Sequence, residues 1–407
     1  MKLQGLQEYK GYKGYNEFVG GLMKKQKFAH ISDLHLGIRL NEYSFLEDQE
    51  YILGQILEII RREQVTALLI SGDIYDKGIP SVEAVKLFDE FITKLAEEKI
   101  ETFIISGNHD SAERLAVGSE IFENSGIHIS RTLAEGCKKV VLEDPEGPIE
   151  IHMVPYLKPA HVKAVLRDQG EDEKADTIDS YTKAMEWVID SLDKDEDNRK
   201  ILLAHQFITG GERSDSEEVV IGGLGNIESS VFEGFDYVAL GHLHKPQNVN
   251  DFVRYCGTPL KYSLSELNNK NSVTVVSFDG KNLVKEMIPL VPKRNIVELR
   301  GTYDELMSKS FYDKYNLDDY FYIVLTDETD VVDGASKLMT VYEKLLKLSY
   351  ERHLDSSNSE SILNTQVKMK SPAENIMEFF KLQNDKDLSE YQKSIIEKLC
   401  EELGGEK

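Results

Sequence analysis

Cysteine is scarce in this 407-residue sequence, which holds only Cys137, Cys256 and Cys400. The three are scattered, odd in number and without the spacing of thiolate metal ligands, which argues against a disulfide framework and for a reducing cytoplasm. No apolar run approaches the length of a membrane span. Residues 1–22 lack the apolar segment of a signal peptide. We therefore expect a cytoplasmic protein.

The first 22 residues also lack hydrophobic periodicity and carry a small Tyr-Lys-Gly repeat. We predict a disordered leader over 1–22, with the folded part beginning near Met23. The whole chain is too long for one typical domain, so two or three domains are expected.

Positive charge is in short supply, and the net charge is −24. Taken alone, this balance disfavours nucleic acid as a partner. Much of the acid lies in two runs, at 168–180 and 190–197, which are typical of solvated surface. Bound divalent cations or a basic partner can supply the missing positive potential. The charge therefore weakens a nucleic-acid function without excluding it.

What the sequence does have is a set of short apolar runs rich in β-branched residues. They lie at 28–32, 67–71, 102–106, 201–205 and 237–241. Runs of this length fit strands that are buried on both faces. Helix-like spacing of apolar residues occurs between them at 47–63, 81–98 and 181–192, with Ser81 as a possible N-cap. This alternation predicts an α/β fold, a layered β-sandwich core flanked by helices.

Each of the five runs delivers side chains of ligand type at or just past its carboxyl end. In chain order they are Asp33, His35, Asp73, Asn108, His109, Asp110, His205, His242 and His244. Ligand sites in layered α/β sheets lie beyond the carboxyl ends of strands, so we expect these side chains to converge. One Asp-x-His or His-x-His pair alone is weak evidence, whereas five strand ends in order indicate one site.

The side chains support two metal ions rather than one. Seven possible ligands exceed what one ion can take with room for substrate, and Asp73 can bridge two ions through its two oxygens. Imidazole and oxygen ligands without thiolate favour Mn²⁺, Fe²⁺ or Zn²⁺ over Mg²⁺ or Ca²⁺, and we expect two divalent ions. Two ions about 3.5–4 Å apart activate water and hold the oxygens of an in-line phosphoryl displacement. The pattern therefore predicts phosphoester hydrolysis.

The order D-x-H, G-D, G-N-H-D, H and G-H-x-H resembles the calcineurin-like metallophosphoesterase superfamily. The resemblance implies that one metal is held by Asp33, His35, Asp73 and His244, and the other by Asp73, Asn108, His205 and His242. It also implies that His109 stabilises the transition state or protonates the leaving oxygen. We expect Asp110 to orient His109, as a carboxylate commonly does for a catalytic imidazole.

The segments "SGNHDSAERL", "SDSEE", "FDYVALGHLHKPQ" and "YCGTPLKYSLSE" are similar, more narrowly, to the SbcD family of bacterial exonuclease subunits. This similarity runs from about Lys27 to Phe278. Asp76 stands where archaeal and eukaryotic relatives carry a further histidine, whose role is not transferred to it. The resemblance implies a nuclease subunit that cuts double-stranded DNA ends and opens hairpins together with an SbcC-like coiled-coil ATPase, in DNA repair, recombination and replication.

The same resemblance implies a domain plan and an assembly. We expect a nuclease domain over 23–290, a smaller α+β DNA-capping domain over 295–370, and a helical partner-docking segment over 372–407. A homodimer within a heteromeric complex is expected. The chain has no G-x-x-x-x-G-K-[ST], and "GGLGN" at 222–226 lacks the lysine, so ATP dependence must come from the partner.

Within the last two parts, a strand is predicted at 320–327, a helix at 335–348 and two amphipathic helices over 372–404. In the last helix, Ser389 and Gln392 have capping-box spacing. Apolar residues fall on one face of it, and such a stripe could be domain core or a docking surface; these residues are Tyr391, Ile395, Leu399 and Leu403.

Two other functions stay open at this point. The chain could be a phosphodiesterase or phosphatase acting on small molecules or phosphoproteins, or a non-catalytic scaffold that has kept a metal fold. The full set of ligand candidates speaks against the scaffold. The remaining histidines match no motif and are expected to be structural: His30, His128, His152, His161 and His353.

Overall fold

The computed structural model describes residues 24–212, 226–351, 373, 376–377, 380–381 and 387–404, without the side chains of 397 and 401–404. It divides into two compact units, Met1–Tyr350 and Glu351–Lys407. The predicted leader, the "SDSEE" segment and most of "GGLGN" lie outside the described residues.

The first of two six-stranded sheets has the strand order β14-β13-β1-β4-β5-β6. Its strands are β1 (Lys27–Ile31), β4 (Ala67–Ser71), β5 (Glu101–Ile105), β6 (Ile127–Ile129), β13 (Ser272–Asp279) and β14 (Asn282–Pro289). β1, β4, β5 and β6 are parallel, whereas β13 and β14 pair antiparallel. The strands predicted at 28–32, 67–71 and 102–106 are confirmed to within one residue.

The second six-stranded sheet has the order β11-β12-β10-β9-β8-β7. Its strands are β7 (Lys138–Leu142), β8 (Ile149–Met153), β9 (Arg199–His205), β10 (Tyr237–Gly241), β11 (Gln247–Asn248) and β12 (Val253–Tyr255). β8, β9, β10 and β12 are parallel. The strands predicted at 201–205 and 237–241 are confirmed, and the former begins two residues earlier than expected, at Arg199.

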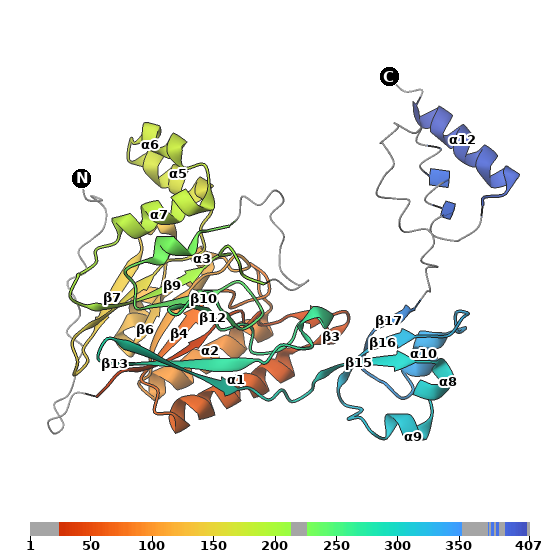
Figure 1. Ribbon diagram of the computed structural model, residues 1–407, viewed down its shortest axis with the longest axis horizontal. Helices are drawn as coiled ribbons and strands as arrows, with labels where there is room; N and C mark the ends of the chain where they lie inside the picture. Colours follow the sequence, from red (N-terminus) through yellow and green to blue (C-terminus); the bar gives the residue numbers. More distant parts are fainter. Residues whose placement is uncertain are drawn as a thin grey trace. The chain divides into compact units, whose positions relative to one another are not determined.

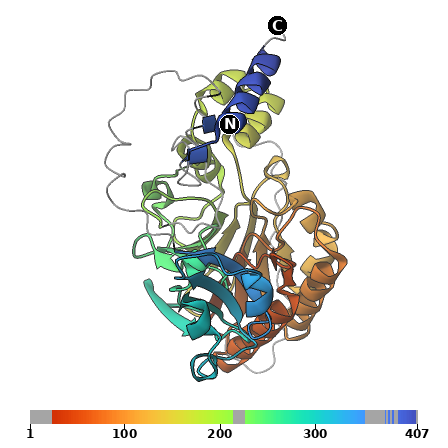
Figure 2. The same ribbon diagram turned by 90° about the vertical axis from the view of Figure 1, so that its right-hand side faces the viewer.

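Helices cover the outer face of each sheet. α1 (Leu46–Arg62) and α2 (Val82–Glu97) pack on the first sheet, and α5 (Pro159–Asp168), α6 (Asp172–Thr177) and α7 (Tyr181–Ser191) lie beside the second. Figure 1 shows the two groups on opposite sides of the strands, and Figure 2 keeps α1 and α2, in red to orange, along one side. The predicted N-cap is confirmed, since the Ser81 hydroxyl accepts a hydrogen bond from the Ala84 N–H.

Side chains of β4 alternate between the two faces of the first sheet, so this strand contributes to two hydrophobic cores. Ala67 and Leu69 face the space between the sheets, whereas Leu68 and Ile70 pack against α1 and α2. All four are fully buried, and burying a leucine or isoleucine side chain stabilises the fold by about 1.5–3 kcal/mol. The result is a four-layer αββα arrangement, which confirms the predicted sandwich core flanked by helices.

A smaller parallel sheet with the order β15-β16-β17 follows within the first unit. Its elements are β15 (Ile296–Gly301), α8 (Tyr303–Leu306), α9 (Lys309–Tyr312), β16 (Tyr320–Leu325), α10 (Gly334–Leu338) and β17 (Leu345–Tyr350). The strand predicted at 320–327 is confirmed. The helix predicted at 335–348 is wrong in its second half, because residues 345–350 pair with β16 instead. Short apolar runs are ambiguous between helix and strand until a partner strand decides.

The remaining elements are short, apart from one helix of the second unit. They are the hairpin of β2 (Arg39–Leu40) and β3 (Tyr43–Ser44), α3 (Ala112–Leu115), α4 (Ser119–Phe122), the 3-10 turns η1 (Glu123–Ser125), η2 (Leu133–Glu135), η3 (Ser229–Phe232) and η4 (Leu264–Glu266), and α12 (Glu390–Gly404). The capping box before α12 is confirmed by reciprocal hydrogen bonds between Ser389 and Gln392. The first helix predicted over 372–404 lies mostly outside the described residues. Among those residues, no helix is both long enough and apolar enough for a membrane crossing.

Candidate metal centre

The carboxyl ends of five strands meet where the two sheets lie against each other. Ser71, the last residue of β4, joins the sheets: its hydroxyl donates to the Ala239 carbonyl at 2.9 Å, and its own carbonyl accepts from the His205 ring at 2.7 Å. β1, β4 and β5 end at this edge from one sheet, and β9 and β10 from the other. The structure therefore brings the predicted ligand residues of both sheets together.

Asp73 lies at the centre of this group. Its Oδ2 is 3.2 Å from His205 Nε2 and 3.8 Å from His35 Nε2, so one carboxylate oxygen stands between two histidines from opposite sheets. Its Oδ1 accepts a hydrogen bond from the His109 backbone N–H at 2.8 Å. Only 2% of Asp73 is exposed. This position fits the bridging role that the sequence suggests.

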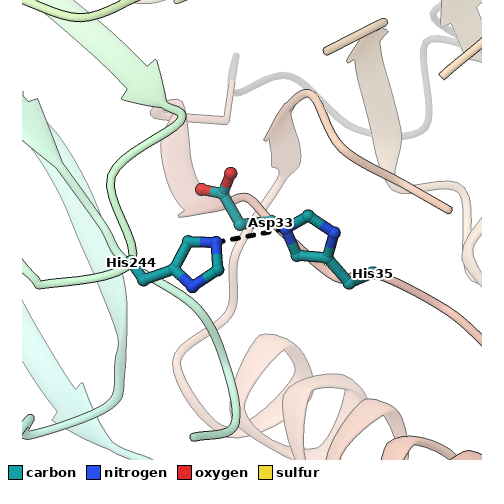
Figure 3. A group of neighbouring side chains, drawn as sticks. All are labelled: Asp33, His35 and His244. Atoms are coloured by element: carbon teal, nitrogen blue, oxygen red, sulfur yellow. Dashed lines mark hydrogen bonds between the residues drawn. The ribbon is translucent and has the colours of Figure 1, made fainter. Parts of the chain in front are cut away.

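One donor set consists of Asp33, His35 and His244, whose ligand atoms all lie within 4.8 Å of one another. The two imidazoles face each other, with 3.2 Å between their Nε2 atoms, and the Asp33 carboxylate lies beside them (Figure 3). All three residues are buried. Two ring nitrogens and a carboxylate converging in this way form a suitable cradle for a divalent cation.

The other donor set gathers around Asn108. Its Oδ1 lies 3.0 Å from His205 Nε2 and 3.0 Å from His242 Nδ1. Asp33, Asp73 and His205 form a second group with ligand atoms within 4.8 Å. The two oxygens of Asp33 also share the His242 backbone N–H, at 3.0 and 3.2 Å. Both acidic residues therefore stand between the two donor sets.

The donor chemistry fits two divalent cations. Imidazole nitrogens, carboxylate oxygens and one amide oxygen are present, and thiolate is absent from both donor sets. Nδ1 of the buried His35 has no hydrogen-bond partner in the protein.

The backbone around these ligands is strained. Among the described residues, eight that are not glycine have a positive φ, and four of them are Asp33 (53°), His35 (43°), Asp73 (49°) and His242 (100°). Side chains with a Cβ seldom adopt this conformation, and each instance costs about 1–3 kcal/mol. Strain of this kind occurs at functional sites. Four of the candidate ligands have it, whereas Asn108, His205 and His244 do not.

Two glycines allow the strand ends to approach so closely. A Cβ on Gly107 would overlap the carboxylate and the backbone nitrogen of Asp73, and one on Gly241 would stand 2.7 Å from the His205 ring nitrogen. Neither site can accept even a methyl group without movement of a ligand residue.

The hydrogen bonds of His109 and Asp110 differ from the expected pair. His109 Nδ1 lies 2.9 Å from the backbone carbonyl of Asp76, so that carbonyl orients the imidazole. The Asp110 carboxylate instead accepts the backbone N–H groups of Ile74, Tyr75 and Gly107 at 2.9–3.1 Å. The orienting role given to Asp110 therefore needs correction: a carboxylate that can gather three N–H donors fixes the loops after β4 and β5 rather than the ring.

Burial and mutual charge shift the pKa values of three residues in the centre, Asp33, Asp73 and His205. Burial raises the pKa of Asp33 to about 6, against the opposing influence of His205. Burial opposes the ionisation of Asp73 too, but the neighbouring imidazoles hold its pKa well below the ordinary range. Burial likewise opposes protonation of His205, yet Asp73 and Asp33 raise its pKa to about 9. A cation that uses His205 must therefore displace a proton.

Two residues that hold the centre in place escaped the sequence reasoning. The Glu266 carboxylate lies 2.9 Å from His244 Nδ1. The Gln49 side chain donates to the Leu34 and His35 carbonyls and accepts from the Gly37 N–H, which fixes the turn that carries His35. No spacing pattern in the sequence marks Glu266. Gln49 could have been noticed, because it is a polar residue in phase with the buried apolar positions of α1.

The histidines expected to be structural have ordinary partners. His30 Nδ1 contacts the Tyr237 hydroxyl at 2.8 Å, and His128 and His152 contact Glu101 and Glu150. His161 closes the first turn of α5. His353 lies outside the described residues.

Comparisons with known proteins agree with this geometry. A family model described as calcineurin-like phosphoesterase matches residues 26–246. The SbcD subunit of the nuclease SbcCD from Staphylococcus epidermidis is 34% identical over 380 residues, which cover 92% of this chain and 97% of that protein.

Two solved structures cover 65% of this chain. A dimetal phosphatase from Danio rerio aligns over 96% of its own length with 11% identity and a TM-score of 0.41. The protein TT1561 of Thermus thermophilus aligns over 99% of its length with 12% identity and a TM-score of 0.36. The family match, over more than half of the chain, and the relative matched along nearly its full length show that this chain belongs to the calcineurin-like phosphoesterase family and is a metal-dependent phosphodiesterase.

Proposed function

We propose that the chain is the nuclease subunit of an SbcCD-type complex and hydrolyses DNA phosphodiester bonds. The observation that carries this proposal is the extent of the similarity to the SbcD subunit of that nuclease. The family model ends at residue 246, whereas the relative matches 92% of the chain. A match over this share of the chain extends past the family model into the small sheet, which a phosphoesterase domain alone does not explain.

The two donor sets supply the catalytic centre in this proposal. Asp33, His35, Asp73 and His244 would hold one cation, and Asp73, Asn108, His205 and His242 the other, with Mn²⁺ as the expected metal. Two divalent cations activate water and neutralise charge on phosphate oxygens. His109 donates Nδ1–H to the Asp76 carbonyl, so Nε2 is the ring atom that faces the reaction, and it would give a proton to the leaving oxygen from the doubly protonated ring.

We propose that α12 belongs to the segment that docks the SbcC-like ATPase, at 372–407. Its apolar stripe is exposed, with 76% of Tyr391, 41% of Ile395 and 50% of Leu399 accessible. Exposed apolar stripes of this kind mark interaction surfaces. The partner would provide the ATPase activity and positive charge for DNA that a chain of net charge −24 lacks.

A second exposed apolar surface supports the proposed homodimer. Ile79 and Val82 at the start of α2 are 75% and 65% exposed, and Val117 and Ile121 beside α3 and α4 are 72% and 73% exposed. Arg114 joins the two groups through a 2.6 Å hydrogen bond to the Gly78 carbonyl. Exposed large apolar side chains of this kind suit a surface that a second copy of the chain would cover.

In this proposal residues 295–370 form the DNA-capping domain, and the complex acts in the cytoplasm on double-strand ends and hairpins during repair, recombination and replication. The parallel β15–β17 sheet with α8, α9 and α10 is the described part of that domain.

The test uses purified protein with Mn²⁺ on linear duplex and hairpin DNA. Asp73→Asn should remove most of the cutting and weaken the binding of both cations, because Asp73 belongs to both proposed donor sets. Asp176→Asn, on an exposed carboxylate of α6 that pairs with Arg167, is the matched control and should cut normally. Cutting that persists in Asp73→Asn would refute the assigned centre. Fast hydrolysis of nucleotide diesters, with duplex ends left intact, would favour the small-molecule phosphodiesterase instead.

A further inference from the structure

We propose that Glu266 is a positioning residue that sets the tautomer and the direction of His244 at one of the two cation sites. This inference rests on the proposed function only for the identity of the reaction. Its physical basis is a single contact, 2.9 Å between Glu266 Oε1 and His244 Nδ1. Glu266 is fully buried and His244 is 5% exposed, so water does not compete for this bond.

Glu266 is itself held in place on both oxygens. Oε2 accepts the Tyr262 backbone N–H at 2.8 Å, and Oε1 also accepts the Ser263 hydroxyl at 3.1 Å. The three residues belong to one short segment that ends in the 3-10 turn η4, Leu264–Glu266. The carboxylate therefore presents a fixed acceptor to the imidazole rather than following it.

The bond determines which ring nitrogen is free to bind a cation. A carboxylate accepts only, so His244 Nδ1 carries the proton and donates it to Glu266. Nε2 then keeps its lone pair, and this atom faces His35 Nε2 at 3.2 Å beside Asp33. Outer carboxylates of this kind fix ring orientation and increase the basicity of the ligand nitrogen.

The same segment braces His35 through Tyr262. The Tyr262 ring lies edge-on to that of His35, with 5.8 Å between centroids, and its hydroxyl donates to the Leu34 carbonyl at 2.7 Å. Two ligands of one cation site are thus supported by residues 262–266. At the other site, His205 donates Nδ1–H to the Ser71 carbonyl. Loss of the Glu266 carboxylate should therefore weaken one cation and leave the other unchanged.

Glu266→Gln tests this inference because it keeps the size and removes the charge. Titration calorimetry with Mn²⁺ should show two ions in the unaltered protein, and in the variant one of them should bind about 10–100-fold more weakly. Glu150→Gln is the matched control, since Glu150 is also buried and contacts a histidine, His152, at 3.0 Å. That variant should bind both ions with unchanged affinity.

Nitrogen NMR of ¹⁵N-histidine-labelled, metal-free protein gives a second readout that a merely structural role would not alter. The His244 signal, identified by its loss in His244→Gln, should report protonated Nδ1 in the unaltered protein. In Glu266→Gln it should shift toward a mixture of tautomers. Unchanged affinities and an unchanged His244 signal in Glu266→Gln would overturn the proposal.

The outcome also separates this inference from the proposed function. If both ions bind, Glu266→Gln weakens one and DNA stays uncut, the nuclease function fails and the role of Glu266 stands. If DNA is cut and Glu266→Gln binds both ions normally, the role of Glu266 fails alone.

Discussion

The His109 imidazole is oriented by the carbonyl of Asp76, 2.9 Å from its Nδ1. His109 stands outside both expected donor sets, although its ring lies edge-on to His35 with 4.8 Å between centroids. We predict that His109→Ala lowers the rate of phosphodiester hydrolysis by about 10²–10⁴-fold, as loss of a general acid does, while both cations still bind. Single-turnover cutting at saturating Mn²⁺, with calorimetry beside it, checks both parts. A rate within threefold of the unaltered protein would contradict the role.

Asp110 should act on stability more than on proton transfer. Its carboxylate gathers the N–H groups of Ile74, Tyr75 and Gly107. In Asp110→Asn the amide group has one acceptor oxygen, so a backbone N–H loses its partner or faces another donor. We expect the free energy of unfolding to fall by about 1–3 kcal/mol, measured by urea denaturation. An unchanged midpoint would show that the loops do not need these bonds.

Gly107 should not tolerate a side chain. A Cβ there overlaps the Asp73 carboxylate and backbone nitrogen, so Gly107→Ala must move the shared ligand, and we expect at least about a tenfold loss of Mn²⁺ affinity. Gly54→Ala is the control: it lies in α1 with nothing within 4 Å of a new Cβ. That variant should bind metal normally and gain about 1 kcal/mol in the free energy of unfolding, because alanine favours helix. Equal metal affinity in both variants would contradict the close approach.

Acid should destabilise the fold through His30. Burial, assisted by the charge of Arg254, lowers the pKa of His30 to about 3. The unfolded chain therefore binds this proton near pH 6.5 and the folded chain does not, so the stabilising contribution is complete above about pH 6.5 and is lost as pH falls toward 3. The expected slope is about 1.4 kcal/mol per pH unit in this window.

His30→Gln isolates this effect, because glutamine has no titrating group and can still accept from the Tyr237 hydroxyl. Urea denaturation at pH 7, 5.5 and 4.5 should give a steeper loss in the unaltered protein than in the variant. Parallel pH profiles would show that His30 does not carry the dependence.

Arg294 should be an anchor for the small sheet. It contacts Asp48 at 2.9 Å and Asp318 at 3.0 Å, and Asp48 is buried beside the Tyr320 hydroxyl. Arg294→Ala leaves the Asp48 charge buried without its cation, and we expect a loss of about 3 kcal/mol in thermal or urea unfolding. Arg167→Ala removes the same charge from an exposed pair and should change stability by less than about 1 kcal/mol. Similar losses in the two variants would contradict the anchoring.

The sequence anticipated the elements whose signal is local and the site whose residues follow them. The apolar runs at 67–71 and 237–241 became strands because burial on both faces requires continuous hydrophobicity. The candidate ligand residues were expected to converge because parallel strands deliver their carboxyl ends to one edge.

The features that sequence patterns did not predict depend on contacts between distant segments. Glu266 reaches His244 across 22 positions, and the Asp76 carbonyl reaches His109 across 33. The helix expected at 335–348 failed for the same reason, since pairing with β16 decided the conformation of its second half.

The positive φ angles at Asp33, His35, Asp73 and His242 reduce the stability of the fold, although the same residues are needed as candidate ligands. Asparagine or glycine would relax these positions, so a chain that discarded its ligands would fold more readily in the absence of metal. Cations that bind only the folded chain would stabilise it and offset the cost of this backbone conformation. We therefore expect the chain without cations to unfold more easily than the chain with Mn²⁺ bound.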